Sequence, residues 1–143
     1  MKKLVLTTAL FLGLSVQAQS ATVCTNDNLM GEWTGKYIVA SPLFVGACTV
    51  VFDNNLIPSG KCDNLNDGES IDIFDGTATI SKRCDVKARM SFNNSSKMTT
   101  VVKMTADKQH MSGTFISSLN GKITQAKMTF QKTGGLSCQV VHD

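Results

Sequence analysis

The 143-residue sequence predicts an all-β protein, a single antiparallel meander of eight or nine short strands closed into an up-and-down β-barrel and stabilised by disulfide bonds. Two observations lead to this prediction. Apolar and polar residues alternate in many segments, which is the period of a strand with one buried face. Runs of Asn, Asp, Ser and Gly separate these segments, as tight hairpins require. Short links between neighbouring strands favour the barrel, and a β-sandwich is the alternative.

The expected strands follow one another at regular spacing. They cover residues 32–40, 46–53, 56–62, 70–74, 77–82, 84–92, 97–106, 110–118 and 123–132. Alternation is clearest in 84–92, where the even positions from Cys84 to Phe92 are apolar and the odd positions are charged or polar. A helix would scatter the apolar side chains around its surface. Only residues 25–30 favour a helix, and for one turn at most.

Turn-forming residues punctuate the chain between these strands. They are Ser41-Pro42, Asp53-Asn54-Asn55, Asn66-Asp67-Gly68, Asp75-Gly76, Asn93-Asn94-Ser95-Ser96 and Asn120-Gly121. Asn120-Gly121 is the sharpest hairpin signal, because both residue types tolerate the positive φ that a two-residue turn demands.

Residues 1–18 have the layout of a secretory signal peptide, and residues 19–143 form the expected barrel domain. Lys2 and Lys3 are followed by a mostly apolar, uncharged run over 4–16 and by the small-residue cleavage signal Val16-Gln17-Ala18. The run is shorter than the ~20 residues of a membrane-spanning helix. The short basic start is typical of bacteria, so we expect a periplasmic or secreted protein without an integral membrane segment.

The expected mature chain is almost neutral. Loss of Lys2 and Lys3 leaves 12 of the 14 basic side chains against 11 acidic ones, a net charge of +1. This balance gives no electrostatic reason to expect a nucleic-acid partner.

All five cysteines lie beyond the expected signal peptide, where an oxidising compartment favours disulfides. Cys48 and Cys62 flank the turn at Asp53-Asn54-Asn55 and are the first choice of bridge, since a hairpin places them opposite each other. A Cys62–Cys84 bridge is the alternative. Cys24 and Cys138 lie near the chain ends, which a closed meander brings together, so we expect a second bridge between them. Cys84 is then the unpaired, buried thiol.

The sequence contains no catalytic or metal-binding motif that we recognise. Nucleophile, metalloprotease and phosphate-loop patterns are absent, there is no Cys-x-x-Cys, and His110 and His142 are isolated. The acidic residues from Asp63 to Asp75 do not have the donor spacing of a calcium loop. We therefore expect a protein that is not an enzyme and has no cofactor or metal.

The segment Leu29-Met30-Gly31-Glu32-Trp33-Thr34 contains the only tryptophan. A Gly-x-Trp at the start of the first strand of a small barrel resembles the calycin group, which includes lipocalins, avidins and bacterial metalloprotease inhibitors of the serralysin-inhibitor type. The resemblance implies that Trp33 plugs one barrel end. The inhibitors also have a cysteine pair downstream, which Cys48 and Cys62 resemble, and insert an N-terminal segment into the protease cleft. The matching segment here is 19–28, which departs from the pattern by containing Cys24.

These observations leave three hypotheses for function. The leading one is an exported, non-catalytic binding protein that acts on a protein partner, with inhibition of an exported protease as its sharpest form. The first alternative is a carrier of a small apolar ligand in a barrel pocket. Its expected lining is Trp33, Met90, Phe92, Met104, Phe115, Met128 and Phe130. The second alternative is a structural or matrix protein, monomeric or a disulfide-linked dimer, that assembles through the unpaired cysteine.

Overall fold

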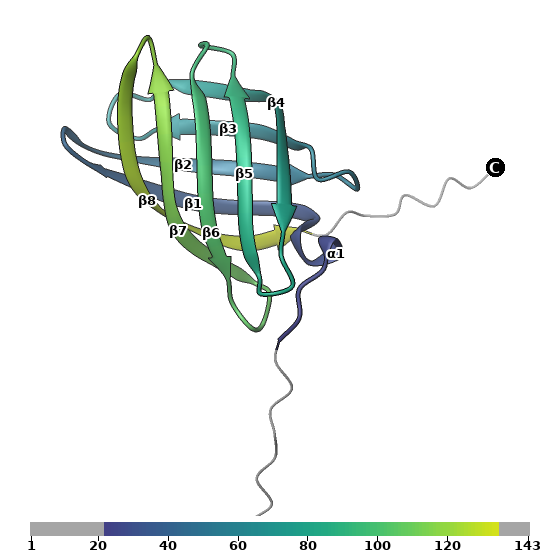
Figure 1. Ribbon diagram of the computed structural model, residues 1–143. Coiled ribbons are helices and arrows are strands. Elements are labelled where there is room, and N and C mark those ends of the chain that lie inside the picture. The colour runs from purple at the N-terminus through teal and green to yellow at the C-terminus, as the bar shows by residue number, and fades with distance from the viewer. Residues whose placement is uncertain (1–21, 135–143) are drawn as a thin grey trace, which may run out of the picture.

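The computed structural model describes residues 22–134, which form a closed antiparallel barrel preceded by one helical turn (Figure 1). The elements are α1 (Asn26–Leu29), β1 (Gly31–Ala40), β2 (Leu43–Phe52), β3 (Pro58–Asn64), β4 (Ser70–Ile80), β5 (Asp85–Phe92), β6 (Lys97–Met104), β7 (His110–Leu119) and β8 (Lys122–Gly134). Each strand pairs with the next and β8 pairs with β1, so the up-and-down barrel is confirmed over the sandwich. The expected signal peptide, Cys138 and His142 lie outside the described residues.

The structure has one strand, β4, where the sequence predicts two, at 70–74 and 77–82. Asp75-Gly76 was expected as a turn but lies inside β4, beside a bulge at Phe74 where the register with β5 shifts between Ile73 and Asp75. A Cβ on Gly76 would lie 2.2 Å from the carbonyl oxygen of Arg89, so only glycine allows the two backbones to approach this closely. A bulge bends its strand without ending it, and this bend lets β4 curve around the barrel.

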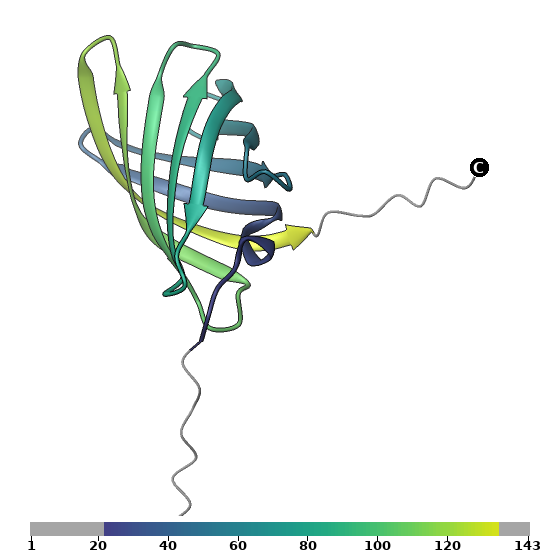
Figure 2. The ribbon, with the colours of Figure 1, turned by 45° about the vertical axis from the view of Figure 1, so that its right-hand side comes forward.

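The hairpin connections divide between two ends of the barrel. Residues 53–57, 81–84 and 105–109 lie at the same end as α1, which we call the closed end. Residues 41–42, 65–69, 93–96 and 120–121 lie at the other, the open end, where Figures 1 and 2 show the β5–β6 and β7–β8 hairpins at the top. Alternate side chains of every strand point inward and build one hydrophobic core.

The closed end is plugged by α1 and Trp33. The side chains of Leu29 and Trp33 are both fully buried, and the Trp33 indole N–H donates a hydrogen bond of 2.8 Å to the Leu29 carbonyl oxygen. From β8, the Lys132 ammonium lies 5.4 Å from the centroid of the Trp33 ring and donates to the Asn28 carbonyl oxygen at 2.9 Å. Burial lowers the pKa of Lys132. Two hydrogen bonds, one from β1 and one from β8, therefore hold the helical turn against the barrel.

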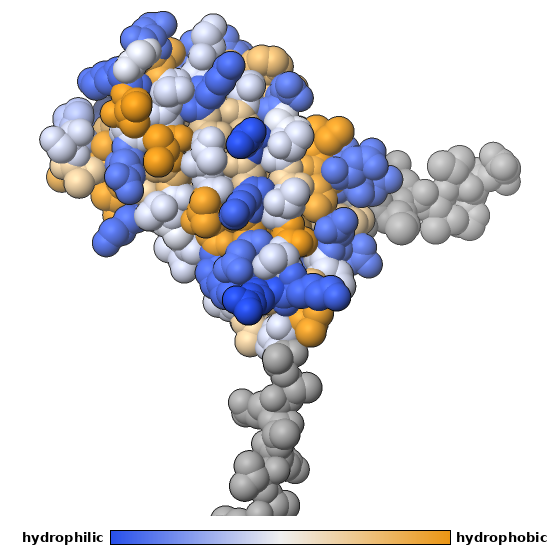
Figure 3. All heavy atoms as spheres, viewed as in Figure 1, coloured by the Kyte–Doolittle hydropathy of each residue, from blue (hydrophilic) through white to orange (hydrophobic). Residues whose placement is uncertain are grey.

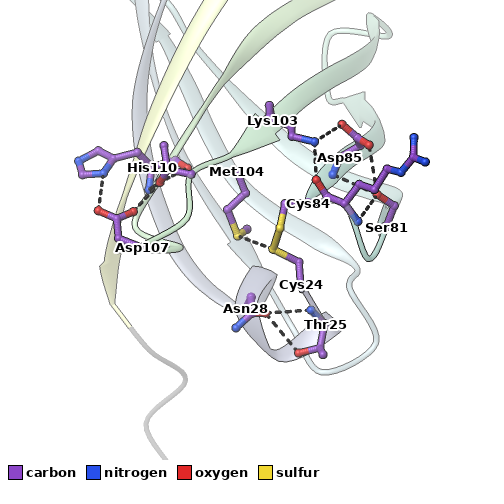
Figure 4. The surroundings of a disulfide bond; sticks show 12 residues. Cys24, Thr25, Asn28, Ser81, Cys84, Asp85, Lys103, Met104, Asp107 and His110 are labelled. Carbon is purple, nitrogen blue, oxygen red and sulfur yellow. Dashed lines mark hydrogen bonds and ion pairs between the residues drawn. A yellow bond between two sulfur atoms is a disulfide. The ribbon is translucent and has the colours of Figure 1, made fainter. Parts of the chain in front are cut away.

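A disulfide joins Cys24 to Cys84 and fixes the start of this plug (Figure 4). The expected Cys24–Cys138 bridge and the expected unpaired Cys84 are therefore wrong. The first and last strands are neighbours, as expected. Cys24, however, precedes α1 and does not continue the line of the first strand, so this neighbourhood does not determine its partner. Its backbone N–H donates to the Lys82 carbonyl oxygen, which places it on the β4–β5 turn. Cys84 itself has a φ of 67° and stands outside the alternation of β5.

The second disulfide joins Cys48 to Cys62, the pair expected from the sequence. The two residues are directly opposed in the β2–β3 register, with their Cα atoms 4.0 Å apart. Two disulfides indicate a chain that folds in an oxidising, extracellular type of environment. Among residues 22–134, no helix has the length and apolar character needed to cross a membrane.

The outer surface alternates polar and apolar residues, and the face seen in Figure 3 mixes hydrophilic and hydrophobic side chains. Val101 on β6 and Ile116 on β7 are each half exposed, and Phe74 at the β4 bulge is 67% exposed. Scattered exposed apolar residues of this kind are normal on small proteins.

Candidate functional site

The barrel interior is filled in its closed half. A void of about 20 Å³ lies there, with room for a single water molecule. Trp33, Met90 and Phe130 line it, while Met104 and Met128 are packed in the same core with at most 3% of their surface exposed. Five of the seven residues expected to line a pocket thus lie where no ligand fits. The long, flexible methionine side chains fill this irregular space.

The open half contains a cavity of about 270 Å³ that opens toward the hairpins of that end. Its lining residues are Tyr37, Phe44, Cys48, Cys62, Asn64, Glu69, Ile71, Phe92, Asn94, Ser96, Met98, Phe115, Ser117, Leu119 and Thr124. Phe92, Met98 and Phe115 are buried and form the apolar floor. The Cys48–Cys62 disulfide forms part of one wall.

Three aromatic side chains gather on one side of this cavity. The Tyr37 ring meets Phe115 edge to face, with centroids 5.4 Å apart, and Phe44 in the same manner at 6.0 Å. Such geometry is the preferred one for aromatic pairs. Gly46 makes the arrangement possible, because a Cβ at that position would lie 1.9 Å from Tyr37 Cζ. The absence of one side chain on β2 therefore creates the seat for the only tyrosine of the chain.

Polar residues form the rim, and several of them are already engaged with one another. Asn64 Nδ2 donates to the Asp67 carboxylate at 3.0 Å, and the Glu69 backbone N–H donates to the same carboxylate at 2.9 Å. On the β5–β6 connection at the same rim, Ser96 Oγ donates to Asn94 Oδ1. Within residues 22–134 the Glu69 carboxylate makes no hydrogen bond or ion pair, so it is available to a ligand.

The rim also imposes a local electrostatic field. Burial raises the pKa of Tyr37 above its usual value, and the negative charges of Asp63 and Asp67 raise it further. Asp63 is partly compensated, because Lys61 Nζ lies 3.7 Å from its carboxylate. The β3–β4 side of the mouth therefore favours positive charge and disfavours negative charge.

Two of the seven residues expected to line a pocket, Phe92 and Phe115, line this cavity, whereas its other aromatic residues, Tyr37 and Phe44, were not among the expected ones. The positions of Tyr37 and Phe44 in the sequence could have indicated that they face the interior. Tyr37 stands four residues after Trp33 on one strand, so the period of two places both rings inside the barrel. The sequence does not show which half of an inward-facing row is filled. That depends on how side chains from opposite strands meet.

No metal centre is formed by the described part of the chain. Among residues 22–134 no group of three or more His, Cys, Asp and Glu side chains lies close enough together to hold an ion. His110 pairs with Asp107 at 3.5 Å on the exposed β6–β7 turn, away from the cavity (Figure 4). The absence of enzymatic activity stays a prediction from the sequence.

Comparison with solved structures finds barrels of the same shape. EF1p2_mFAP2b, in a structure bound to DFHBI, superposes with a TM-score of 0.65 at 12% sequence identity, over 74% of this chain and 94% of that one. A de novo designed fluorescence-activating β-barrel superposes with a TM-score of 0.60 at 13% identity, over 76% of this chain and 100% of that one. No protein-family model and no curated protein matches the sequence. At such identities the similarity shows the fold alone, and it carries no link to the serralysin inhibitors.

Proposed function

We propose that this protein is an exported, non-catalytic carrier that binds a small, largely apolar molecule in the cavity at the open end of the barrel. The cavity itself is the observation that carries the proposal, because the other half of the same barrel is filled. A cavity of about 150 Å³ in a protein core is enough to hold benzene. The volume of about 270 Å³, open at the mouth, therefore suits a molecule with one to three rings, or a short branched chain.

The lining has the composition of a binding site for such a molecule. Buried aromatic and thioether side chains form the floor, and a few polar groups at the rim would orient the ligand, which is the usual division in small-molecule sites. Barrels of this fold can hold small compounds, as the neighbour bound to DFHBI illustrates. That protein differs from this chain at most positions, so it supports the type of site and not the identity of the ligand.

The protease-inhibitor hypothesis has no comparable support. It needs an N-terminal segment that enters a protease cleft, and the matching segment here is 19–28. Within that segment Cys24 is bonded to Cys84, and the following Leu29 is fully buried beneath the barrel. Residues from 24 onward are thus occupied in closing the barrel. Assembly through an unpaired cysteine depends on Cys138, which lies outside the described residues.

A pair of adjacent serines on β7 allows a direct test of the carrier function. Ser117 lines the cavity, whereas its neighbour Ser118 faces outward, as alternation on a strand requires. We expect the neutral dye N-phenyl-1-naphthylamine to bind the wild-type protein with increased fluorescence. Ser117→Trp fills the cavity and should weaken dye binding about tenfold or more, since the site is lost rather than altered.

Ser118→Trp is the matched control, with the same added volume on the outer surface, and should bind the dye like the wild type. Far-UV circular dichroism and thermal unfolding of both variants check that the barrel is intact. Dye binding that is absent from the wild type, or equal in the two variants, would contradict binding in this cavity.

A further inference from the structure

We propose that the cavity selects ligands that carry a positive charge, so that the natural ligand class is an apolar amine whose ammonium group lies at the β3–β4 side of the mouth, beside Glu69. This inference rests on the proposed carrier function and specifies its ligand class. It depends on which charged groups line the cavity and on where their nearest counter-charges lie.

Glu69 is the one charged side chain in the cavity lining, and no Lys, Arg or His of the described residues lines it. Asp67 stands two positions earlier on the same β3–β4 connection, and its carboxylate is held at the rim by Asn64, itself a lining residue. Two carboxylates therefore border one side of an otherwise uncharged cavity. Asp63 adds less, because Lys61 is its partner in an ion pair.

Two basic side chains begin strands at the open end, and neither lines the cavity. Lys97 begins β6, after a connection that lies two strands away from the β3–β4 connection. Lys122 begins β8, next to the Asn120-Gly121 turn, and lines a shallow groove that shares Ser117 and Thr124 with the cavity wall. In the closed strand order, the β7–β8 connection lies four strands away from the β3–β4 connection. Neither lysine lines the cavity or lies on the β3–β4 connection, so the β3–β4 side of the mouth is negative.

The physical consequences for two ligands of the same shape are opposite. An ammonium group near Glu69 would gain a partner for its charge and would lie close to the aromatic group of Tyr37, Phe44 and Phe115, whose rings attract cations. A carboxylate at the same place would lose water, face a like charge and find no donor of positive charge in the lining. Burial is the main cause of the raised pKa of Tyr37, and the negative charges of Asp63 and Asp67 add to it, as expected if a new negative charge at this place is opposed.

The test compares three compounds that share a naphthalene body: 1-naphthylmethylamine, neutral 1-methylnaphthalene and 1-naphthoate, each measured by displacement of N-phenyl-1-naphthylamine at pH 7 and low salt. We expect the amine to bind roughly tenfold more tightly than the carboxylate, the neutral compound lying between them, as one charge pair near the protein surface allows at low salt. Added salt should reduce the difference because the rim charges are exposed.

Glu69→Gln should remove most of the preference for the amine and leave 1-methylnaphthalene unaffected. Glu32→Gln is the matched control, because Glu32 lies at the closed end, where it accepts a hydrogen bond from Thr133. The Glu32→Gln variant should prefer the amine to the carboxylate as strongly as the wild type does.

The outcomes separate this inference from the carrier function on which it rests. Equal binding of amine and carboxylate, or tighter binding of the carboxylate that Lys122→Gln weakens, would overturn the charge selection and leave the cavity as a binding site. If the wild type binds neither the dye nor any of the three naphthalene compounds, both the charge selection and the carrier function are overturned.

Discussion

Replacement of Trp33 by phenylalanine should destabilise the barrel by about 3 kcal/mol. The indole N–H donates to the buried Leu29 carbonyl oxygen at 2.8 Å, and leaving that oxygen without a partner costs roughly 1–3 kcal/mol. The smaller ring leaves a void of roughly 40 Å³, worth about 1 kcal/mol at about 24 cal/mol per Å³. Part of the contact with the Lys132 ammonium, 5.4 Å from the ring centroid, is lost as well.

Urea unfolding followed by circular dichroism measures this loss, since the variant has no tryptophan fluorescence. In a domain of roughly 100 residues, a loss of about 3 kcal/mol lowers Tm by about 12 °C. Tyr37→Phe is the control, because it removes only the hydroxyl group from a ring that is partly buried, and we expect a change below about 0.5 kcal/mol. A Trp33→Phe variant as stable as the wild type would refute the view that the Trp33–Leu29 bond anchors the plug. The variant should still bind the dye, because Trp33 does not line the cavity.

Three further predictions concern the cavity and the disulfides. Gly46→Ala should lower stability by about 1–3 kcal/mol and weaken dye binding, because its Cβ would lie 1.9 Å from Tyr37 Cζ and displace that ring, as unfolding and dye titration will show. Replacement of both Cys24 and Cys84 by serine should cost about 4 kcal/mol in urea unfolding, from the entropy of a loop that closes over 60 residues; a negligible loss would show that the bridge does not constrain the unfolded chain. The phenol of Tyr37, the only tyrosine, should titrate with a pKa above 10.0, read from absorbance near 295 nm, and Asp67→Asn should move it back toward that value. Since the folded state favours the neutral phenol, its contribution to stability is complete below pH 10 and decreases as pH rises through the raised pKa.

The barrel could be predicted from the sequence because alternation and turn residues are local signals. The period of two in 84–92 and the Asn120-Gly121 turn depend on neighbours in the chain, and the structure has a strand and a hairpin at these places. The turn predicted at Asp75-Gly76 was wrong because it, too, was inferred from local residue types alone. Its residues are those of a turn, but their pairing with Ser91 and Met90 of the next strand keeps both inside β4.

Of the two disulfides, one could be predicted from local sequence and the other could not. Cys48 and Cys62 lie on one hairpin, so their opposition follows from the turn between them. The partner of Cys24 depends on the path of the chain before β1, which crosses the closed end and meets the β4–β5 turn. No periodic signal describes that path, and the Gly-x-Trp resemblance concerns the residues after it.

The division of the interior into a filled and a hollow half was the least predictable feature. Met90 and Phe92 are successive inward residues of β5, equal in the sequence pattern, yet Met90 packs beneath Trp33 and Phe92 lines the cavity. The difference arises from partners on other strands, as where Gly46 on β2 leaves space for the Tyr37 ring. Such exchanges of volume between strands cannot be read from one strand at a time.

This division has a consequence for how the protein can diverge. Each strand contributes inward residues to the filled half and, toward the open end, to the cavity wall, so adjacent positions are subject to different selection. Ser117 and Thr124 at the wall can be exchanged for larger or charged residues without disturbing the Trp33 plug. Descendants of this chain could therefore acquire new cargo through substitutions at the open end while inheriting an unchanged folding core.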